Sequence, residues 1–292
     1  MSSHRAVECE VLVEGLEIPE CPVWHAPSQS LFFVDIPAGT LNRWYHRERR
    51  REIWTLPEPL GCFALIDEHR FIVGLSSGLY WFDTRTEQLA FLHDPEPGKT
   101  RNRINDGKVG ADGHFWFGTM NYDGEPEAGL YRFSPEGECR TVLTGLKTSN
   151  GLAWSTNGRR VFHSDSRGQY LQCLDCDEYG HPGEPRRLCH LGEEDGRPDG
   201  AAMDTLDRYW SAGVSASWLN LLDGEGQLLE RIQLPWAKPS MPCFGGPDMT
   251  TVFVTLLATE QSPGRLIVFE GDTPGAEVPA FRPRFTPPDS IV

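Results

Sequence analysis

Four residues with oxygen-bearing side chains recur along this chain at related intervals: Glu20, Asn105, Asn150 and Asp199. Two carboxylates and two amide oxygens form a hard donor set, which suits Ca²⁺, Mg²⁺ or Mn²⁺ better than a metal that prefers thiolates. So few protein ligands leave coordination positions for water or substrate. The set therefore suits a cation that acts as a Lewis-acid catalyst.

These residues belong to a longer series of polar or glycine-bearing positions that punctuates the whole chain. Its members lie 42, 44, 45, 49 and 44 residues apart, at Glu20, Gly61-Cys62, Asn105-Asp106-Gly107, Asn150-Gly151, Asp199-Gly200 and Pro242 to Gly246. Each member opens a stretch of several short apolar runs that are separated by turn residues. A period of this length, with about four strands per repeat, predicts an all-β fold, a six-bladed β-propeller. Equivalent first strands then line one central channel and bring the four ligands together.

The strand pattern supports one closed domain over residues 1–292, with blades in about 15–275 and a tail at 276–292. Pairs of apolar runs, such as Leu31–Asp35 and Leu41–Tyr45, recur in each repeat and predict paired strands. Asp112-Gly113, Asn157-Gly158 and Asp223-Gly224 predict hairpins in which both central residues have positive φ. No long amphipathic helix is expected. Residues 173–198 are expected to form a surface loop, and the proline-rich tail an edge strand or a frayed, disordered end.

Composition limits the classes of partner. The formal net charge is −15, so the surface repels phosphate backbones and nucleic-acid binding is not expected. No signal-like core follows Met1 and no apolar run approaches 18 residues, which predicts a cytoplasmic protein without a membrane partner. The eight cysteines are expected to be reduced, and a monomer is favoured.

Three further motifs have a simpler structural interpretation. Gly74 to Gly78 matches the serine nucleophile pattern G-x-S-x-G, but it links two predicted strands and no helix follows. Cys173 and Cys176 have metal-ligand spacing, but no second pair exists to complete a zinc site. Cys21 lies beside Glu20 and could ligate a softer metal, although packing is the simpler interpretation. None of these motifs competes with the repeated oxygen ligands.

At these positions the chain resembles the SMP-30/gluconolactonase family, which includes regucalcin and the sugar lactonases. The motifs that carry the resemblance run in order at blade spacing: Glu20-Cys21-Pro22-Val23-Trp24, Arg103 to Lys108 with Gly118-Thr119-Met120, Ser149-Asn150-Gly151-Leu152 with Ser164-Asp165-Ser166, Pro198-Asp199-Gly200, and Cys243 to Asp248. They span residues 19 to about 256.

The resemblance implies a six-bladed propeller with one divalent metal ion in its channel, whether Ca²⁺, Mn²⁺, Mg²⁺, Zn²⁺ or Fe²⁺. It implies Glu20, Asn150 and Asp199 as the metal ligands and Asp199 as the catalytic general base or acid. Arg103 and Asn105 match the residues that bind the substrate. The implied reaction is the hydrolysis of a small-molecule sugar lactone, of the glucono-, xylono- or arabinono-type, to its aldonic acid.

Two departures from the family pattern leave alternatives open. Pro19 and Cys21 flank Glu20 where the family usually has glycine, which leaves the choice of metal open. Some relatives have a substrate-contacting Glu soon after G-T-M, whereas here Asn121 to Glu125 follow Met120. A calcium-binding regulatory protein of the regucalcin type remains an alternative. An esterase or organophosphate hydrolase on the same scaffold is another, although Arg103 and Asn105 favour a sugar.

Overall fold

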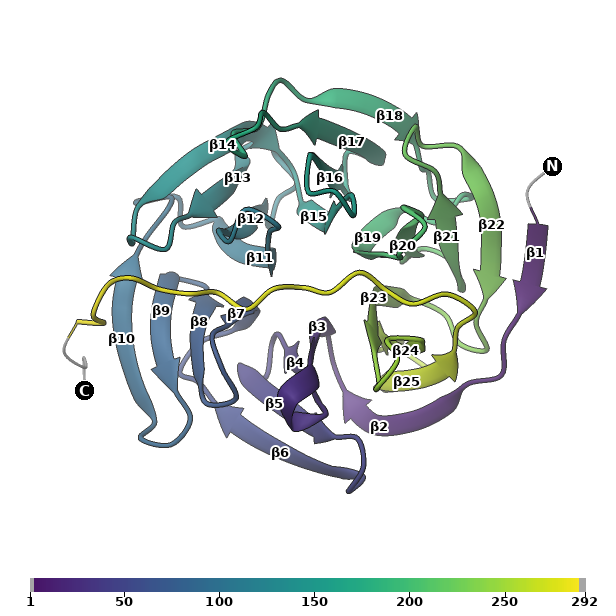
Figure 1. Cartoon of the computed structure of the whole chain (residues 1–292), viewed down its shortest axis with the longest axis horizontal. Coiled ribbons are helices and arrows are strands. Elements are labelled where there is room, and N and C mark those ends of the chain that lie inside the picture. The colour runs from purple at the N-terminus through teal and green to yellow at the C-terminus, as the bar shows by residue number, and fades with distance from the viewer. Residues whose placement is uncertain (1–2, 289–292) are drawn as a thin grey trace.

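A computed structural model describes residues 3–288 and arranges six antiparallel sheets in a ring (Figure 1). The innermost strands of the six blades are β3 (Pro19–His25), β7 (Leu60–Leu65), β11 (Asn102–Val109), β15 (Ser149–Trp154), β19 (Pro198–Met203) and β23 (Pro239–Gly245). Each innermost strand contacts the next around the ring, and β23 contacts β3. The predicted all-β, six-bladed propeller is therefore confirmed, and every recurring polar position falls on an innermost strand.

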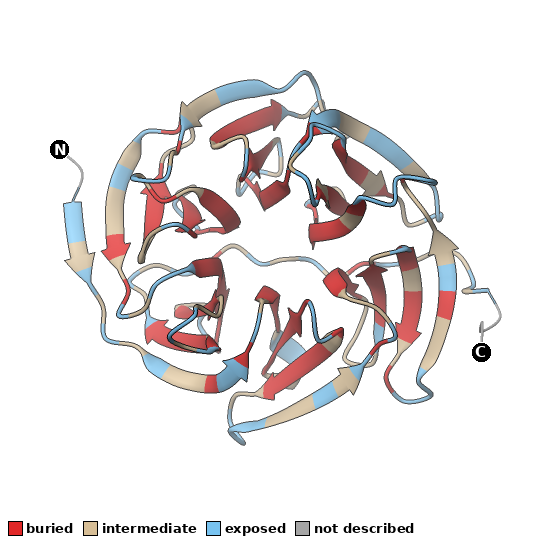
Figure 2. Ribbon diagram, turned by 180° about the vertical axis from the view of Figure 1, so that it is seen from behind, coloured by how far each residue is buried: buried red, intermediate tan, exposed pale blue. Residues whose placement is uncertain are grey.

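The middle strands of the blades match the predicted pairs of apolar runs. The second strands are β4 (Ser30–Asp35), β8 (Arg70–Leu75), β12 (Phe115–Asn121), β16 (Arg160–Asp165), β20 (Tyr209–Gly213) and β24 (Thr251–Leu256). The third strands are β5 (Thr40–Tyr45), β9 (Gly78–Asp83), β13 (Ala128–Phe133), β17 (Tyr170–Asp175), β21 (Trp218–Leu222) and β25 (Gly264–Glu270). These strands are largely buried on both faces, because each blade is covered by its neighbours (Figure 2).

The outer strands consist mostly of partly buried and exposed residues, as expected at the rim of the ring (Figure 2). They are β6 (Arg50–Thr55), β10 (Gln88–His93), β14 (Cys139–Leu146), β18 (Arg186–His190), β22 (Leu228–Gln233) and β2 (Glu10–Leu16). The N-terminal β2 completes the last blade by pairing with β25, so the two ends of the repeat array are joined in one sheet. A short strand, β1 (Ser3–Ala6), pairs in parallel with β22.

Four predictions about local structure were wrong, one for a loop and three for turns. Residues 173–198 are not only a loop, because β18 lies within them and forms the outer edge of the fourth blade. The turns at Asp112-Gly113 and Asn157-Gly158 have positive φ at the glycine alone. At Asp223-Gly224 neither residue has positive φ, and the left-handed residue of that turn is Gly226. These turns are longer than two-residue hairpin loops, and the Asp112 and Asp223 carboxylates accept backbone N–H groups within them.

Helix is nearly absent from the described residues, as expected. A single 3₁₀ turn, η1 (Ala26–Ser28), occurs between β3 and β4. Among residues 3–288, no helix is long and apolar enough to cross a membrane.

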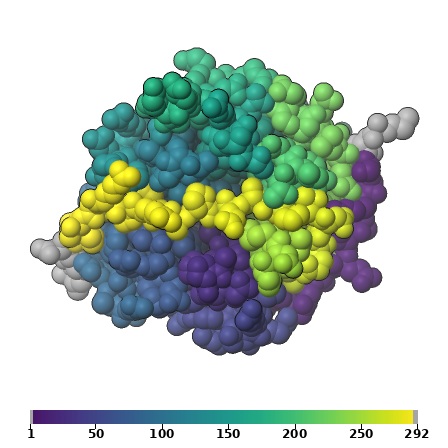
Figure 3. Space-filling model, in the orientation of Figure 1, coloured from purple at the N-terminus to yellow at the C-terminus, as the bar shows by residue number. Residues whose placement is uncertain are grey.

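The described part of the tail does not form the expected edge strand. Residues 271–288 instead cross one face of the ring, from the sixth blade towards the second and third (Figure 3). Ala276 N–H donates to the Met203 carbonyl, and Phe281 N–H donates to the Leu65 carbonyl at 2.7 Å. The tail thus spans the channel end at which the innermost strands finish. The expected frayed end at 289–292 lies outside the described residues.

A cavity of about 920 Å³ lies between this tail and the innermost strands. It is lined by residues near the ends of those strands, including Trp154 and Met203, and by residues 274–280 of the tail. The recurring polar residues lie near the beginnings of the same strands. The cavity and the polar residues therefore occupy opposite halves of the channel.

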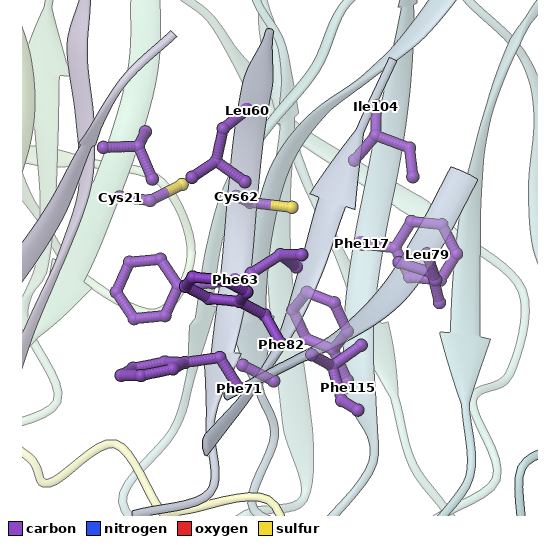
Figure 4. Packing of buried hydrophobic residues seen from close by; sticks show 14 of the residues in the cluster. Cys21, Leu60, Cys62, Phe63, Phe71, Leu79, Phe82, Ile104, Phe115 and Phe117 are labelled. Carbon is purple, nitrogen blue, oxygen red and sulfur yellow. The ribbon is translucent and has the colours of Figure 1, made fainter. Parts of the chain in front are cut away.

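The largest hydrophobic cluster fills the space between the first three blades. Phe32, Phe63, Phe71, Phe115 and Phe117 are almost completely buried within it (Figure 4). Phe281 of the tail joins this cluster, is fully buried, and lies with its ring centroid 6.0 Å from that of Phe133. The tail is therefore anchored by apolar packing as well as by backbone hydrogen bonds.

Replacement of this anchor should destabilise the fold. We expect Phe281→Ala to lower the free energy of unfolding by about 3 kcal/mol, because the ring loses its burial and leaves a cavity. Denaturant titration of the purified protein measures the change. Leu206→Ala, at a side chain that is 66% exposed, is the control and should change stability by less than about 0.5 kcal/mol. Equal effects of the two substitutions would show that the tail is not packed as described.

Candidate functional site in the channel

Every innermost strand is interrupted by a β-bulge near its recurring polar position. The pairing register shifts between Glu20 and Val23, between Ile104 and Gly107, between Asn150 and Ala153, between Pro198 and Ala201, and at the corresponding places in β7 and β23. A bulge redirects side chains that regular alternation would place on the opposite face. The bulges thus allow residues from several blades to turn towards the channel at one level.

Side chains at the ends of the second strands fix where two of these innermost strands begin. The Asp35 carboxylate accepts the N–H groups of Glu17 and Ile18, just before β3. The Asp165 carboxylate accepts the N–H groups of Lys147 and Thr148, just before β15. Since each carboxylate holds the chain immediately ahead of Glu20 or Asn150, it sets the level at which the candidate ligand enters the channel.

The amide side chains of the third and fourth blades are hydrogen-bonded across the blade boundary. Asn105 Nδ2 donates to the Ser149 carbonyl at 3.0 Å and to Asn150 Oδ1 at 3.1 Å. Asn150 Nδ2 donates to Ser166 Oγ at 2.8 Å, and Ser166 Oγ donates to the Pro198 carbonyl next to Asp199. The Asn105 amide nitrogen is thereby engaged with the fourth blade and the Asn150 amide nitrogen with Ser166 of its own blade, which fixes the orientation of the amide oxygens.

The two candidate carboxylates are buried without a cationic partner. Glu20 is 8% exposed and Asp199 is 7% exposed. Within residues 3–288, no Lys, Arg or His nitrogen forms an ion pair with either carboxylate. Burial of an unpaired carboxylate is costly, and a bound cation would offset that cost. This pair of buried, unpaired carboxylates fits a divalent cation.

The pKa values of these carboxyl groups reflect their burial and their mutual repulsion. Burial raises the pKa of Asp199 to about 8, and the nearby charge of Asp106 adds to the increase. Burial likewise raises the pKa of Glu20 well above its usual range, with further contributions from the charges of Asp199 and Asp106. Because the charge of Asp199 contributes to the pKa of Glu20, these two residues lie close in space although they are 179 positions apart in the sequence.

Arg103 lies beside this environment. Its Nη1 donates to the Ile104 carbonyl at 2.8 Å, and its guanidinium carbon is 5.9 Å from the centroid of the Tyr122 ring. The positive charge of Arg103 opposes the increase in the pKa of both Glu20 and Asp199. All five predicted residues, including Asn105, thus lie on innermost strands at the same end of the channel, which is the arrangement expected of a shared site. Their individual roles as ligands or catalytic groups remain predictions.

Sequence reasoning missed one member of this environment, Asp106. Its side chain is buried, accepts from Cys21 Sγ and Leu152 N–H, and raises the pKa of Glu20, Asp199 and Cys21. Regular alternation places Asp106 on the face opposite to Asn105. The bulge between Ile104 and Gly107 breaks that alternation. The sequence feature that could have identified Asp106 was its place within Asn105-Asp106-Gly107, the recurring segment richest in polar residues.

Lys108 lies deeper on the same strand and is almost fully buried. Its Nζ donates to the Ala201 carbonyl of the fifth blade at 2.5 Å. Burial lowers the pKa of Lys108, whereas the charge of Asp106 opposes that decrease. Lys108 therefore partly compensates the negative charge below the candidate ligands.

Cys21 does not have the surroundings of a metal-binding thiolate. Its Sγ lies 3.5 Å from both the Gly61 carbonyl and Asp106 Oδ1, as expected of a thiol that donates a hydrogen bond. Burial raises the pKa of the Cys21 thiol well above its usual range. Within residues 3–288, no group of three or more His, Cys, Asp or Glu side chains is arranged to bind a metal. A cation here would need amide oxygens in addition to Glu20 and Asp199.

Cys21 also has an unusual backbone conformation. Its φ is +47°, in the left-handed region, and it directly follows Glu20. Gly151 follows Asn150 in the same way with φ +65°, and a Cβ there would approach Ser164 Oγ and Tyr209 Oη to 2.4 Å. The two bulges therefore need the same left-handed residue. Glycine adopts that conformation without the strain that a side chain introduces.

This strain can be measured by comparing two substitutions at one position. Cys21→Gly and Cys21→Ala both remove the thiol, but only Cys21→Gly relieves the left-handed strain. We expect the Gly variant to be about 1 kcal/mol more stable than the Ala variant in denaturant titrations. The opposite order would mean that residue 21 is not strained in the folded protein.

The raised carboxyl pKa values predict that stability depends on pH when divalent cations are removed. Between pH 5 and 9 the folded protein holds protons that the unfolded chain has lost, so its free energy of unfolding should fall as pH rises. We expect a loss of at least about 1.4 kcal/mol, equivalent to one pKa unit. Denaturant titrations with chelator at several pH values measure it. Asp199→Asn should flatten this dependence, and an unchanged slope in that variant would contradict the assignment.

Comparisons with known proteins agree with this architecture. The family model of the SMP-30/gluconolactonase/LRE-like region matches residues 18–258. A 6-deoxy-6-sulfogluconolactonase from Pseudomonas putida is 38% identical over 254 residues, which cover 86% of this chain and 87% of the relative. Regucalcin from Xenopus laevis is 30% identical over 266 residues, which cover 87% of each chain.

A solved structure has the same fold over almost the entire length. The calcium-binding protein regucalcin from Agrobacterium tumefaciens superposes with a TM-score of 0.91, and the alignment covers 97% of this chain and all of that one. Sequence identity in this comparison is 21%. The likeness therefore supports the fold and not a particular activity.

Proposed function

We propose that this protein, which belongs to the SMP-30/gluconolactonase/LRE-like family, hydrolyses a sugar aldonolactone to the aldonic acid with the help of one divalent cation. The observation that carries the proposal is the pair of buried carboxylates, Glu20 and Asp199, that have no cationic partner within residues 3–288. The lactonase relative at 38% identity supports the reaction class.

In this proposal Glu20, Asn150 and Asp199 would hold the cation. A cation at this position would supply Lewis-acid polarisation of the lactone carbonyl and of the attacking water. Asn105 adjoins Asn150 and can hydrogen-bond to the substrate through its amide oxygen. Arg103 carries hydrogen-bond donors that can orient the lactone ring, which supplies proximity and orientation.

Asp199 would hold the attacking water. Without a cation, burial raises the pKa of Asp199 to about 8, so the free carboxyl group is largely protonated at neutral pH. A nearby positive charge favours the ionised form and lowers its basicity. Asp199 in the loaded protein therefore orients the water more than it accepts a proton. A cation that binds would displace the protons from Glu20 and Asp199, and its charge would offset the repulsion among the ionised carboxylates, including Asp106.

A calcium-binding regulatory role is the second candidate, because regucalcin relatives match at 30% identity over most of the chain. It predicts cation binding without lactone hydrolysis. An esterase or organophosphate hydrolase is less well supported. The pocket that adjoins Arg103 has hydroxyl and charged groups, such as Ser76, Thr100 and Glu58, among its lining residues.

Loss of either carboxylate should remove cation binding and activity together. We expect Asp199→Ala and Glu20→Gln to lower kcat/KM for glucono-, xylono- or arabinono-lactone by at least about 100-fold, because both groups would act through the same cation. Acid release, corrected for spontaneous lactone opening, measures hydrolysis. Calorimetric titration with Ca²⁺, Mn²⁺, Mg²⁺ and Zn²⁺ measures cation binding.

The control variant is Glu178→Gln, at an exposed carboxylate on the fourth blade, which should retain both properties. Chelator should abolish acid release from the wild-type protein. Near-native kcat in Asp199→Ala with the cation bound would refute the assignment of Asp199. Cation binding by the wild-type protein without hydrolysis of any lactone would favour the regulatory role.

A further inference from the structure

A second pocket opens beside the candidate site, on the same face of the ring. Its volume is about 330 Å³, and it lies between the second and third blades. Arg103 of the innermost strand β11 lines it together with Tyr122, Ser76, Ser77 and Thr100. Since Arg103 also interacts electrostatically with Glu20 and Asp199, this one side chain lies between the pocket and the site.

Hydroxyl groups are a prominent part of the pocket lining. Ser76 Oγ is buried and has no hydrogen-bond partner within the described residues. Ser77 Oγ, by contrast, donates to Glu58 Oε1 and lies 2.8 Å from Tyr80 Oη. A buried hydroxyl without a partner is costly unless a ligand or water completes its hydrogen bonds. The Ser76 hydroxyl is itself enclosed, so a molecule in the pocket could pair with it only after that side chain turns.

The pocket lining carries more negative than positive side chains. Three carboxylates line the pocket, at Glu58, Asp94 and Glu96, against two cations at Lys99 and Arg103. Lys99 is already engaged, because its Nζ lies 3.2 Å from Glu96 Oε1 and 2.7 Å from the Glu127 carbonyl. Glu58 and Asp94 have no ion-pair partner within residues 3–288. Glu58 accepts hydrogen bonds from Ser77 N–H and Oγ, and Asp94 accepts the Glu96 N–H, but neither charge is neutralised by a cation, so an anionic group placed here would be repelled by both carboxylates and attracted by Arg103 alone.

From this lining we infer that the pocket is a subsite for the uncharged, hydroxylated end of the sugar lactone, and that it selects against an anionic substituent at that end. The inference rests on the proposed function and adds its substrate specificity. Hydroxyl groups of the sugar can donate to the carboxylates of Glu58 and Asp94, whereas a sulfonate has only acceptor oxygens and a negative charge. The chain should thus differ from its relative named for a sulfonated lactone.

The test compares two lactones that differ only at carbon 6: gluconolactone and 6-deoxy-6-sulfogluconolactone. We expect the wild-type protein to have a kcat/KM at least about tenfold higher for gluconolactone, because like charges in the pocket oppose the sulfonate. The preference should shrink at high salt concentration, since the carboxylates are only partly buried. Equal rates, or faster hydrolysis of the sulfonated lactone, would overturn the inference.

Substitutions in the lining identify the source of the preference. Glu58→Gln and Asp94→Asn keep an acceptor oxygen but remove a negative charge, and each should reduce the ratio of the two kcat/KM values by about threefold or more. Glu178→Gln removes the same charge from a remote exposed site and should leave the ratio unchanged. If Glu58→Gln and Asp94→Asn both retain the wild-type ratio, the pocket is not the source of selectivity and the inference fails.

A binding experiment separates this inference from the proposed function. If neither lactone is hydrolysed, the lactonase proposal fails, but the affinities for gluconate and for 6-deoxy-6-sulfogluconate can still be compared by calorimetry. Tighter binding of gluconate, with a difference that Glu58→Gln reduces, would support the subsite. Equal affinities, or tighter binding of the sulfonated acid, would overturn it.

Discussion

Mutual repulsion among three buried carboxylates is the constraint on which the architecture of this channel depends. Glu20, Asp106 and Asp199 come from three different blades; besides burial, the charges of Asp199 and Asp106 raise the pKa of Glu20, and the charge of Asp106 raises the pKa of Asp199. Such a group is tolerated only where the surrounding structure fixes it and where a positive charge can approach. The ring of blades meets the first condition, because each carboxylate lies on an innermost strand that its neighbours hold on both sides.

Two positively charged side chains lie close to these carboxylates, at different depths in the channel. Lys108 lies below the carboxylates, bonded to the fifth blade, and partly compensates Asp106. Arg103 lies beside them, next to the side pocket. Neither forms an ion pair with Glu20 or Asp199 within the described residues. The protein's own cations thus stabilise the channel without neutralising the two carboxylates proposed to bind a metal.

The period of the sequence predicted the ring because equivalent positions in a closed repeat must converge, and Glu20, Asn150 and Asp199 fall in phase. The sequence was a poorer guide to which side chains of each blade face the channel. Asp106 escaped notice because alternation assumes a regular strand, whereas the bulge between Ile104 and Gly107 changes which side chains face the channel. The outer strand β18 and the course of the tail depend on contacts with distant segments, such as Phe281 with the core of the first three blades, which no local pattern encodes.

The tail determines from which end the candidate site can be reached. It crosses the end of the channel where the innermost strands finish, and it is held there by backbone bonds to Met203 and Leu65 and by the buried ring of Phe281. The candidate ligands lie near the opposite ends of these strands, beside Arg103 and the pocket between the second and third blades. In the proposed function, a lactone that enters at the end opposite the tail would meet Arg103 and the pocket between the second and third blades beside Glu20 and Asp199. Selection by charge would therefore take place beside the chemistry, because Arg103 lies next to both the pocket and the buried carboxylates.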